Sequence, residues 1–126
     1  MKKIVAILLA VLAILVVAVW LIGYSGTYES HSETYQQLKE SELIDKGWVP
    51  SSIPRSAYDI HEKHRVDVAR VNVRFRFHPD DKKEIEASCT MMSNSDTKTQ
   101  KYRCKHGTDM VVVTLEASGK GKILSE

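Results

Sequence analysis

The sequence lacks most of the motifs that identify an enzyme or a cofactor-binding protein. It has no G-x-S-x-G nucleophile motif, no internal repeat and no low-complexity tract. Its two cysteines are too far apart for the C-x-x-C spacing of a redox pair or a thiolate metal site. These absences favour a protein without a cofactor.

An excess of charge is also missing from most of the chain. The net charge of +2 comes from Lys2 and Lys3, and the rest of the sequence balances sixteen basic against sixteen acidic residues. Nucleic-acid-binding domains usually carry a clear basic excess. The sequence therefore predicts no nucleic-acid partner.

The strongest positive signal is an unbroken apolar run from Ile4 to Ile22, directly after Lys2 and Lys3. As a helix it is about 28 Å long, close to the roughly 30 Å hydrocarbon thickness of a bilayer. It is longer than the apolar core of a typical signal peptide and ends in bulky residues, which favours an uncleaved anchor. A cleaved signal is the alternative, with Gly23 and Ser25 at the −3 and −1 positions.

Flanking charge predicts the orientation of this span. Lys2 and Lys3 precede it, whereas the stretch from 24 to 45 contains five acidic residues and only Lys39. Under the positive-inside rule, residues 1–3 stay in the cytoplasm and the C-terminal part is exported. We therefore expect a single-pass protein of the bacterial inner membrane with a periplasmic domain.

The segment 23–47 is expected to be a hinge followed by a stalk helix. Ser30 and Glu33 form a capping-box pattern, which predicts a helix over 31–45. Glu42 and Lys46 have the favourable i, i+4 spacing, and Gly47 fits the position just past a helix end. Because this helix has few apolar residues, we expect it to pack only weakly on the exported domain, residues 48–126.

Strand patterns dominate that domain. The residues Val71, Val73, Phe75 and Phe77 alternate with polar residues, which predicts a half-buried strand followed by a turn at 79–81. A turn or bulge is expected near 69–70, and the segment 56–64 fits a short helix or a strand about equally. Residues 110–117 predict another strand, and 118–124 a turn and a short tail.

The two cysteines belong to a predicted hairpin with arms at 85–91 and about 102–104 and turn-forming residues at 93–96. Centring the loop on residues 96 and 97 places Cys89 opposite Cys104, and Met91 opposite Tyr102. An even number of cysteines in an exported domain also favours a disulfide. We therefore predict a Cys89–Cys104 bridge.

One stretch resembles a known group of proteins. The sequences Gly47-Trp48-Val49-Pro50 and Ile53-Pro54-Arg55-Ser56-Ala57-Tyr58-Asp59-Ile60, followed by Asp67 before the alternating strand, resemble small membrane-anchored bacterial envelope proteins. The resemblance covers residues 47 to 77. That group brings no known activity, so the resemblance implies a location but assigns no site residue.

Histidines offer one candidate metal site. His61 and His64 share a face if their segment is helical, and His78 or His106 would supply a third ligand. The motif His61-Glu62-Lys63-His64 is not the H-E-x-x-H zinc pattern, because the second histidine comes one residue early. Exposed histidines on a charged segment are the alternative, and no metal is predicted.

Basic residues on strands offer a second candidate. Arg74 and Arg76 share one strand face, and Lys101, Arg103 and Lys105 share another. If these strands belong to one sheet, the five cations form a surface for anionic headgroups, cell-wall polymer or an acidic protein. The alternative is an ordinary solvated strand face that resists aggregation.

Together these patterns predict an α+β protein: a transmembrane helix, then a small, mostly antiparallel sheet of three or four strands with one or two short helices and a disulfide. The function they favour is a non-enzymatic binding module at the outer face of the membrane. The competing hypothesis is a small metal-dependent or hydrolytic envelope enzyme that uses His61 and His64.

Overall fold

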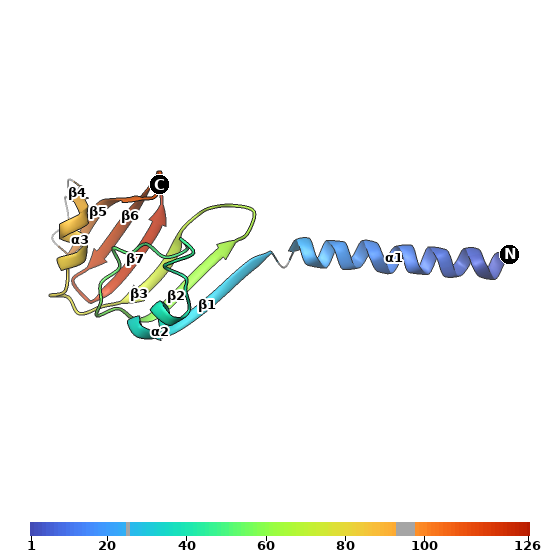
Figure 1. The fold of residues 1–126 in the computed structure, drawn as a ribbon, viewed down its shortest axis with the longest axis horizontal. Helices are drawn as coiled ribbons and strands as arrows, with labels where there is room; N and C mark the ends of the chain where they lie inside the picture. Colours follow the sequence, from blue (N-terminus) through green and yellow to red (C-terminus); the bar gives the residue numbers. More distant parts are fainter. Residues whose placement is uncertain (25, 93–97) are drawn as a thin grey trace.

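The N-terminal apolar run forms one long helix, α1 (Lys2–Tyr24), as predicted. The computed structural model describes residues 1–24, 26–92 and 98–126. The stretch Lys2–Ile22 has a mean hydropathy of 3.3 and none of it is buried against the rest of the protein. Figure 1 shows α1 standing clear of the folded domain. Its apolar surface is therefore available to anchor the chain in a membrane.

The remainder is built on one antiparallel sheet of seven strands in the order β1-β2-β3-β7-β6-β5-β4. The C-terminal strand β7 lies in the middle, between β3 and β6. The strands are β1 (Thr27–Thr34), β2 (Tyr58–Arg65), β3 (Asn72–Arg76), β4 (Cys89–Met91), β5 (Thr99–His106), β6 (Asp109–Glu116) and β7 (Lys120–Ser125).

Alternation along β3 and β6 directs apolar side chains to one face of this sheet. On and beside β3, Val71, Val73, Phe75 and Phe77 are all buried, while Asn72, Arg74 and Arg76 are exposed, which confirms the prediction from their spacing. The strand β6 follows the same rule with its own buried residues. These are Val111, Val113 and Leu115.

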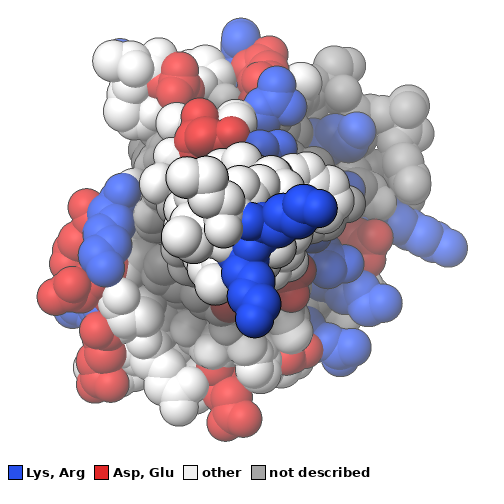
Figure 2. Space-filling view, turned by 90° about the vertical axis from the view of Figure 1, so that its right-hand side faces the viewer, with Lys and Arg blue, Asp and Glu red and all other residues white. Residues whose placement is uncertain are grey.

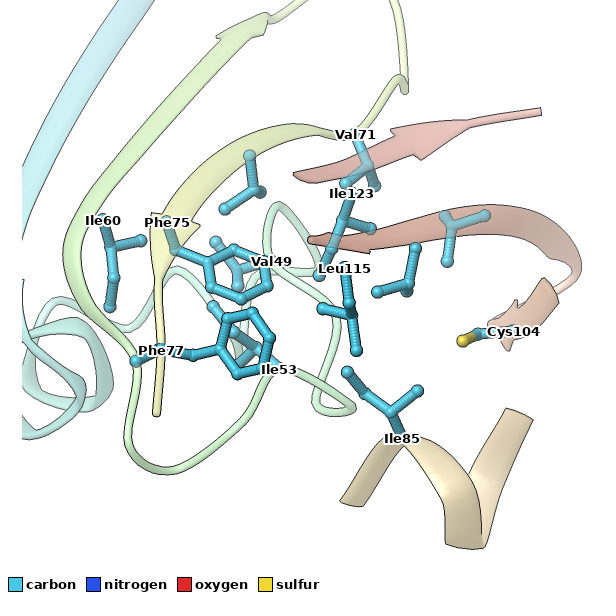
Figure 3. Packing of buried hydrophobic residues seen from close by; sticks show 14 of the residues in the cluster. Val49, Ile53, Ile60, Val71, Phe75, Phe77, Ile85, Cys104, Leu115 and Ile123 are labelled. Carbon is cyan, nitrogen blue, oxygen red and sulfur yellow. The ribbon is translucent and has the colours of Figure 1, made fainter. Parts of the chain in front are cut away.

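The buried face is covered by the short helix α2 (Tyr35–Glu40), the irregular segment 41–57 and the short helix α3 (Lys83–Ser88). Figure 3 shows Val49, Ile53 and Ile85 packing from these covering segments against Phe77 and Leu115 of the sheet. The opposite face of the sheet carries exposed charged side chains. The α+β class with a membrane-length helix is therefore confirmed, with more strands than the three or four expected.

The predicted stalk helix over 31–45 is wrong at both ends, because only Tyr35–Glu40 is helical and residues 41–47 form turns. His31 lies in β1, and the helix α2 begins at Tyr35 after Thr34, whose Oγ1 accepts a hydrogen bond from the Gln37 backbone N–H (3.2 Å). Backbone pairing of β1 with β2 overrides the local capping signal. The segment is also part of the core, because Leu38 is fully buried.

The structure decides four other predictions. The ambiguous segment 56–64 is the strand β2 from Tyr58 onward. The first hairpin arm is wrong over 85–88, where the chain forms α3, and only Cys89–Met91 is a strand. The expected tail 118–124 is instead mostly β7. The turn predicted near 69–70 lies earlier, at residues 66–67.

The predicted register of the hairpin is confirmed. Cys89 pairs with Cys104 and Met91 with Tyr102, and the two cysteines form a disulfide. The proposed turn at 93–96, the centring of the loop on residues 96 and 97, and the cleavage position Ser25 lie outside the described residues. The bridge ties the short edge strand β4 to β5, which is otherwise attached by only three residue pairs.

Removing the bridge should lower the free energy of unfolding. The cysteines are 15 residues apart, and a loop of that size corresponds to about 3 kcal/mol in the chain-entropy account of disulfides. We expect Cys89→Ala/Cys104→Ala to lower the urea midpoint of the full chain in detergent micelles by the concentration that corresponds to this free energy. Reduction of the wild type should produce a similar shift and leave the double variant unchanged. Equal midpoints for oxidised and reduced wild type would contradict the prediction.

Candidate functional site

The sheet pairing aligns basic side chains in a row across its exposed face. On β2, His61 pairs with Arg74 of β3, and Arg74 pairs with Lys122 of β7. Continuing across the sheet, Lys122 pairs with Thr114 of β6, and Thr114 pairs with Lys101 of β5. Directly paired residues of an antiparallel sheet project on the same side. Arg74 and Lys101 therefore lie on one face, with two strands between them.

The two basic stripes predicted from the sequence thus share a face. A second row contains Arg76 paired with Lys120, and Arg103 and Lys105 follow Lys101 at alternate positions of β5. Sequence reasoning missed Lys120 and Lys122, although the alternation Lys-Gly-Lys is a strand-like signal. We call the following set the basic face: Arg74, Arg76, Lys101, Arg103, Lys105, Lys120 and Lys122.

Few carboxylates neutralise this surface. Asp59 lies 4.0 Å from the Arg76 guanidinium, and Glu126 accepts a hydrogen bond from Arg103 Nε (2.7 Å). Among residues 1–24, 26–92 and 98–126, no carboxylate oxygen lies within 4.0 Å of the charged groups of Arg74, Lys120 or Lys122. Viewed along α1, Lys and Arg crowd one flank of the domain, while Asp and Glu predominate on the other (Figure 2).

The central cations border a shallow hollow of about 410 Å³. Arg74 and Lys122 lie on its floor strands, and Thr114 and His61 flank them. The hollow is open to solvent. Its arginines and lysines come from the neighbouring strands β3 and β7, and the carboxylates of Asp59 and Glu116 also border it. It can accept an extended anionic group that lies across the strands.

A histidine–aspartate cluster borders this face on the side of β1. His31 Nε2 lies 2.9 Å and His61 Nε2 lies 3.1 Å from the same oxygen, Asp59 Oδ1. Hydrogen bonding from His31, reinforced by His61, holds the pKa of the Asp59 carboxyl below its usual range. Asp59 has a positive φ of 48°, beside a register shift between Tyr58 and His61. This irregularity turns the carboxylate toward both imidazoles.

The candidate metal ligands His61, His64 and His78 are not brought together, because β2 is a strand. Residues three apart on a strand point to opposite faces, so His61 is on the exposed face and His64 on the core face. His78 lies near Asp80 (3.7 Å), and His106 Nε2 is hydrogen-bonded to the Gly47 carbonyl (2.7 Å). These histidines do not converge.

Within the described chain, His31, Asp59 and His61 form a group with metal-ligand spacing. The distances between their nitrogen and oxygen atoms are close to the ligand–ligand separation of about 3.3 Å in a tetrahedral zinc site with metal–ligand bonds of about 2.0 Å. However, the two imidazole rings are stacked, with centroids 4.4 Å apart and an interplanar angle of 18°. Nearly parallel rings do not direct their lone pairs at one ion. The arrangement is therefore best described as a hydrogen-bonded cluster, and sequence reasoning missed it by assigning His31 to a helix.

A second polar pair is enclosed in the core. Glu62 is only 2% exposed, and its two carboxylate oxygens lie 2.8 and 3.0 Å from His64 Nδ1. The His64 ring stacks on Trp48, with centroids 3.9 Å apart, and more loosely on Tyr28. Burial raises the pKa of Glu62, partly offset by the hydrogen bond with His64. This pair fixes β2 against the covering segment.

The raised pKa predicts a pH dependence of stability. Because the folded state holds the Glu62 proton more tightly than the unfolded state does, stability should fall as pH rises from the ordinary pKa of 4.5 through the raised value. Glu62→Gln keeps an acceptor for His64 and removes the buried charge, so this fall should be reduced. The free energy of unfolding of the full chain, measured with urea between about pH 4 and 7, shows the size of this fall in each variant.

The matched control is Glu33→Gln, which changes an exposed carboxyl on β1. It should retain the wild-type pH profile. Parallel profiles for the wild type and Glu62→Gln would show that the buried carboxyl does not titrate differently on folding.

Comparison with known proteins finds one similarity. Residues 26–76 match the YbbD head domain family, which is less than half of the chain. The match spans β1 to β3 and includes the histidine–aspartate cluster, Glu62, His64 and two arginines of the basic face, whereas β4 to β7 lie outside it. Searches of curated proteins and of solved structures give no match. The family match suggests a small bacterial envelope protein, in agreement with the resemblance found over residues 47–77.

Proposed function

We propose that this is a single-pass protein of the bacterial inner membrane whose exported domain binds an anionic partner through the basic face, without catalysis. The observation that carries the proposal is the alignment of Arg74 and Lys122 across the exposed side of the sheet, next to a hollow and without ion-pair partners in the described residues. The family match and the apolar helix support a membrane-anchored envelope protein.

Charge and redox chemistry support the proposed direction of insertion. Lys2 and Lys3 precede α1, and the stretch after it is acidic, which favours a cytoplasmic N-terminus. The Cys89–Cys104 disulfide supports the same direction, because structural disulfides persist mainly in oxidising compartments such as the periplasm.

The shape of the basic face favours an extended ligand. Neighbouring strands are about 4.8 Å apart, so Arg74 and Lys101, separated by three strand spacings, are roughly 14 Å apart. A small anion would contact only one or two of these cations. A cell-wall polymer with repeated acidic groups, or an acidic protein segment, would contact several at once.

The first experiment tests placement. A reporter enzyme that is active only after export, fused after Glu126, should be active, and the protein should remain in the membrane fraction after alkaline extraction. The same reporter fused before Met1 should be inactive. Activity of the N-terminal fusion alone would contradict the orientation, and release of a soluble form starting near Gly26 would show that α1 is a cleaved signal.

The second experiment tests the basic face. We expect Arg74→Glu/Lys122→Glu to weaken binding of long-chain polyphosphate or polyglutamate to the detergent-solubilised full chain at least tenfold. Thermal stability should be nearly unchanged, because exposed charges contribute little to folding. Wild-type binding should also weaken as salt is raised, since the screening length is only about 8 Å at physiological ionic strength.

A matched control separates a site from net charge. Lys39→Glu/Lys83→Glu makes the same change in net charge at exposed positions on the two short helices, which cover the other face of the sheet. It should leave polymer binding close to wild type. Equal losses in the two double variants would show that binding follows only the net charge of the domain.

A further inference from the structure

The connection between β2 and β3 exposes apolar side chains at an unusual place. We call residues 65–70 the membrane-side turn. Its Val66 is 66% exposed and its Val68 is 36% exposed, whereas the valines at 49, 71, 73, 111 and 113 are buried in the core. Because the two valines lie two positions apart in one turn, their exposed apolar surface is concentrated at this end of the domain.

The chain geometry places this turn beside the exit of α1. The Val66 backbone N–H lies 3.4 Å from the Gly26 carbonyl oxygen, and Gly26 follows Tyr24, the last residue of α1, by two positions. Two residues span at most about 7 Å. The turn is therefore close to the end of the apolar helix whatever angle α1 makes with the domain.

The polar side chains of the turn suit a lipid headgroup layer. Arg65 and Asp67 form a two-point ion pair, with Nε–Oδ1 3.1 Å and Nη2–Oδ2 2.8 Å, so they add no net charge. Arg70 is exposed, and in the part of the chain that the structure describes no carboxylate oxygen lies within 4.0 Å of its guanidinium. Arg65 and Arg70 border a hollow of about 420 Å³ together with Lys63 and Val68.

We propose that the membrane-side turn docks on the leaflet that surrounds α1. Val66 and Val68 enter the interfacial layer, and Arg70 contacts lipid phosphate. Small apolar side chains next to cations are a typical means of interfacial binding. This second contact holds the domain in one orientation above the bilayer, in addition to its covalent connection to α1. The proposal rests on α1 spanning the membrane, as in the proposed function.

Photo-crosslinking of the full chain in lipid nanodiscs tests the docking. The photoreactive residue benzoylphenylalanine replaces Val66 or Val68 in the turn, Val19 in α1, or Ser118 in the exposed β6–β7 turn. We expect lipid adducts, detected by mass, from positions 19, 66 and 68, and severalfold less from 118. These positions are exposed, so the larger side chain should not disturb the core.

The outcomes distinguish the two proposals. If position 19 forms lipid adducts but positions 66 and 68 form no more adducts than position 118, the docking is overturned and the membrane anchor is not affected. Failure of Val19 to label overturns the anchor itself. Labelling of Ser118 as strong as that of Val66 also overturns the docking, because it would mean that the domain contacts lipid without a preferred side.

A charge variant tests the role of Arg70. Adducts from position 68 should increase when phosphatidylglycerol is added to phosphatidylcholine discs, and Arg70→Glu should abolish the increase. Lys83→Glu on α3 is the matched control and should retain it. Equal labelling of the wild type in both lipids, or the same loss in the control variant, would overturn the contact between Arg70 and lipid phosphate.

Discussion

The position of β7 between β3 and β6 is the constraint on which the rest of the domain depends. Without it the chain would form two separate sheets, β1-β2-β3 and β6-β5-β4. The strand supplies Ile123 to the core and pairs with both neighbours along nearly its whole length. Gly121 makes this possible, because a Cβ at that position would overlap the ring of Phe75. Its missing side chain is therefore a packing requirement.

Joining the two halves also creates the basic face. Cations from β3 and β5 would otherwise belong to unrelated surfaces, and β7 adds Lys120 and Lys122 between them. Since α2, α3 and the segment 41–57 all pack on the other side, the cations remain exposed to solvent. One-sided burial of an antiparallel sheet is common, and here it concentrates positive charge in a domain that is neutral as a whole.

Two local contacts connect β4 and β2 to neighbouring elements. The disulfide holds the short edge strand β4, and the buried Glu62–His64 pair links β2 to Trp48 in the covering segment. A buried carboxylate costs free energy, and its hydrogen bonds to His64 offset part of that cost.

The sequence by itself determined the features that depend on local periodicity. The apolar run from Ile4 to Ile22 required a membrane-length helix, and the alternation from Val71 to Phe77 required a half-buried strand. The opposition of Cys89 and Cys104 followed from counting inward positions on either side of a turn. Each of these is a relation between residues close in the chain, so no knowledge of the fold was needed.

Only the tertiary structure decided the features that depend on partners distant in sequence. Thr27–Thr34 has no apolar alternation, and it is a strand because β2 offers its backbone hydrogen bonds. The central place of β7 depends on pairing with residues about fifty positions earlier, and the meeting of His31 with Asp59 and His61 depends on the pairing of β1 with β2. Backbone hydrogen bonds are the same for every residue type. Side-chain patterns therefore indicate where a strand forms, but they say much less about which other strand it pairs with.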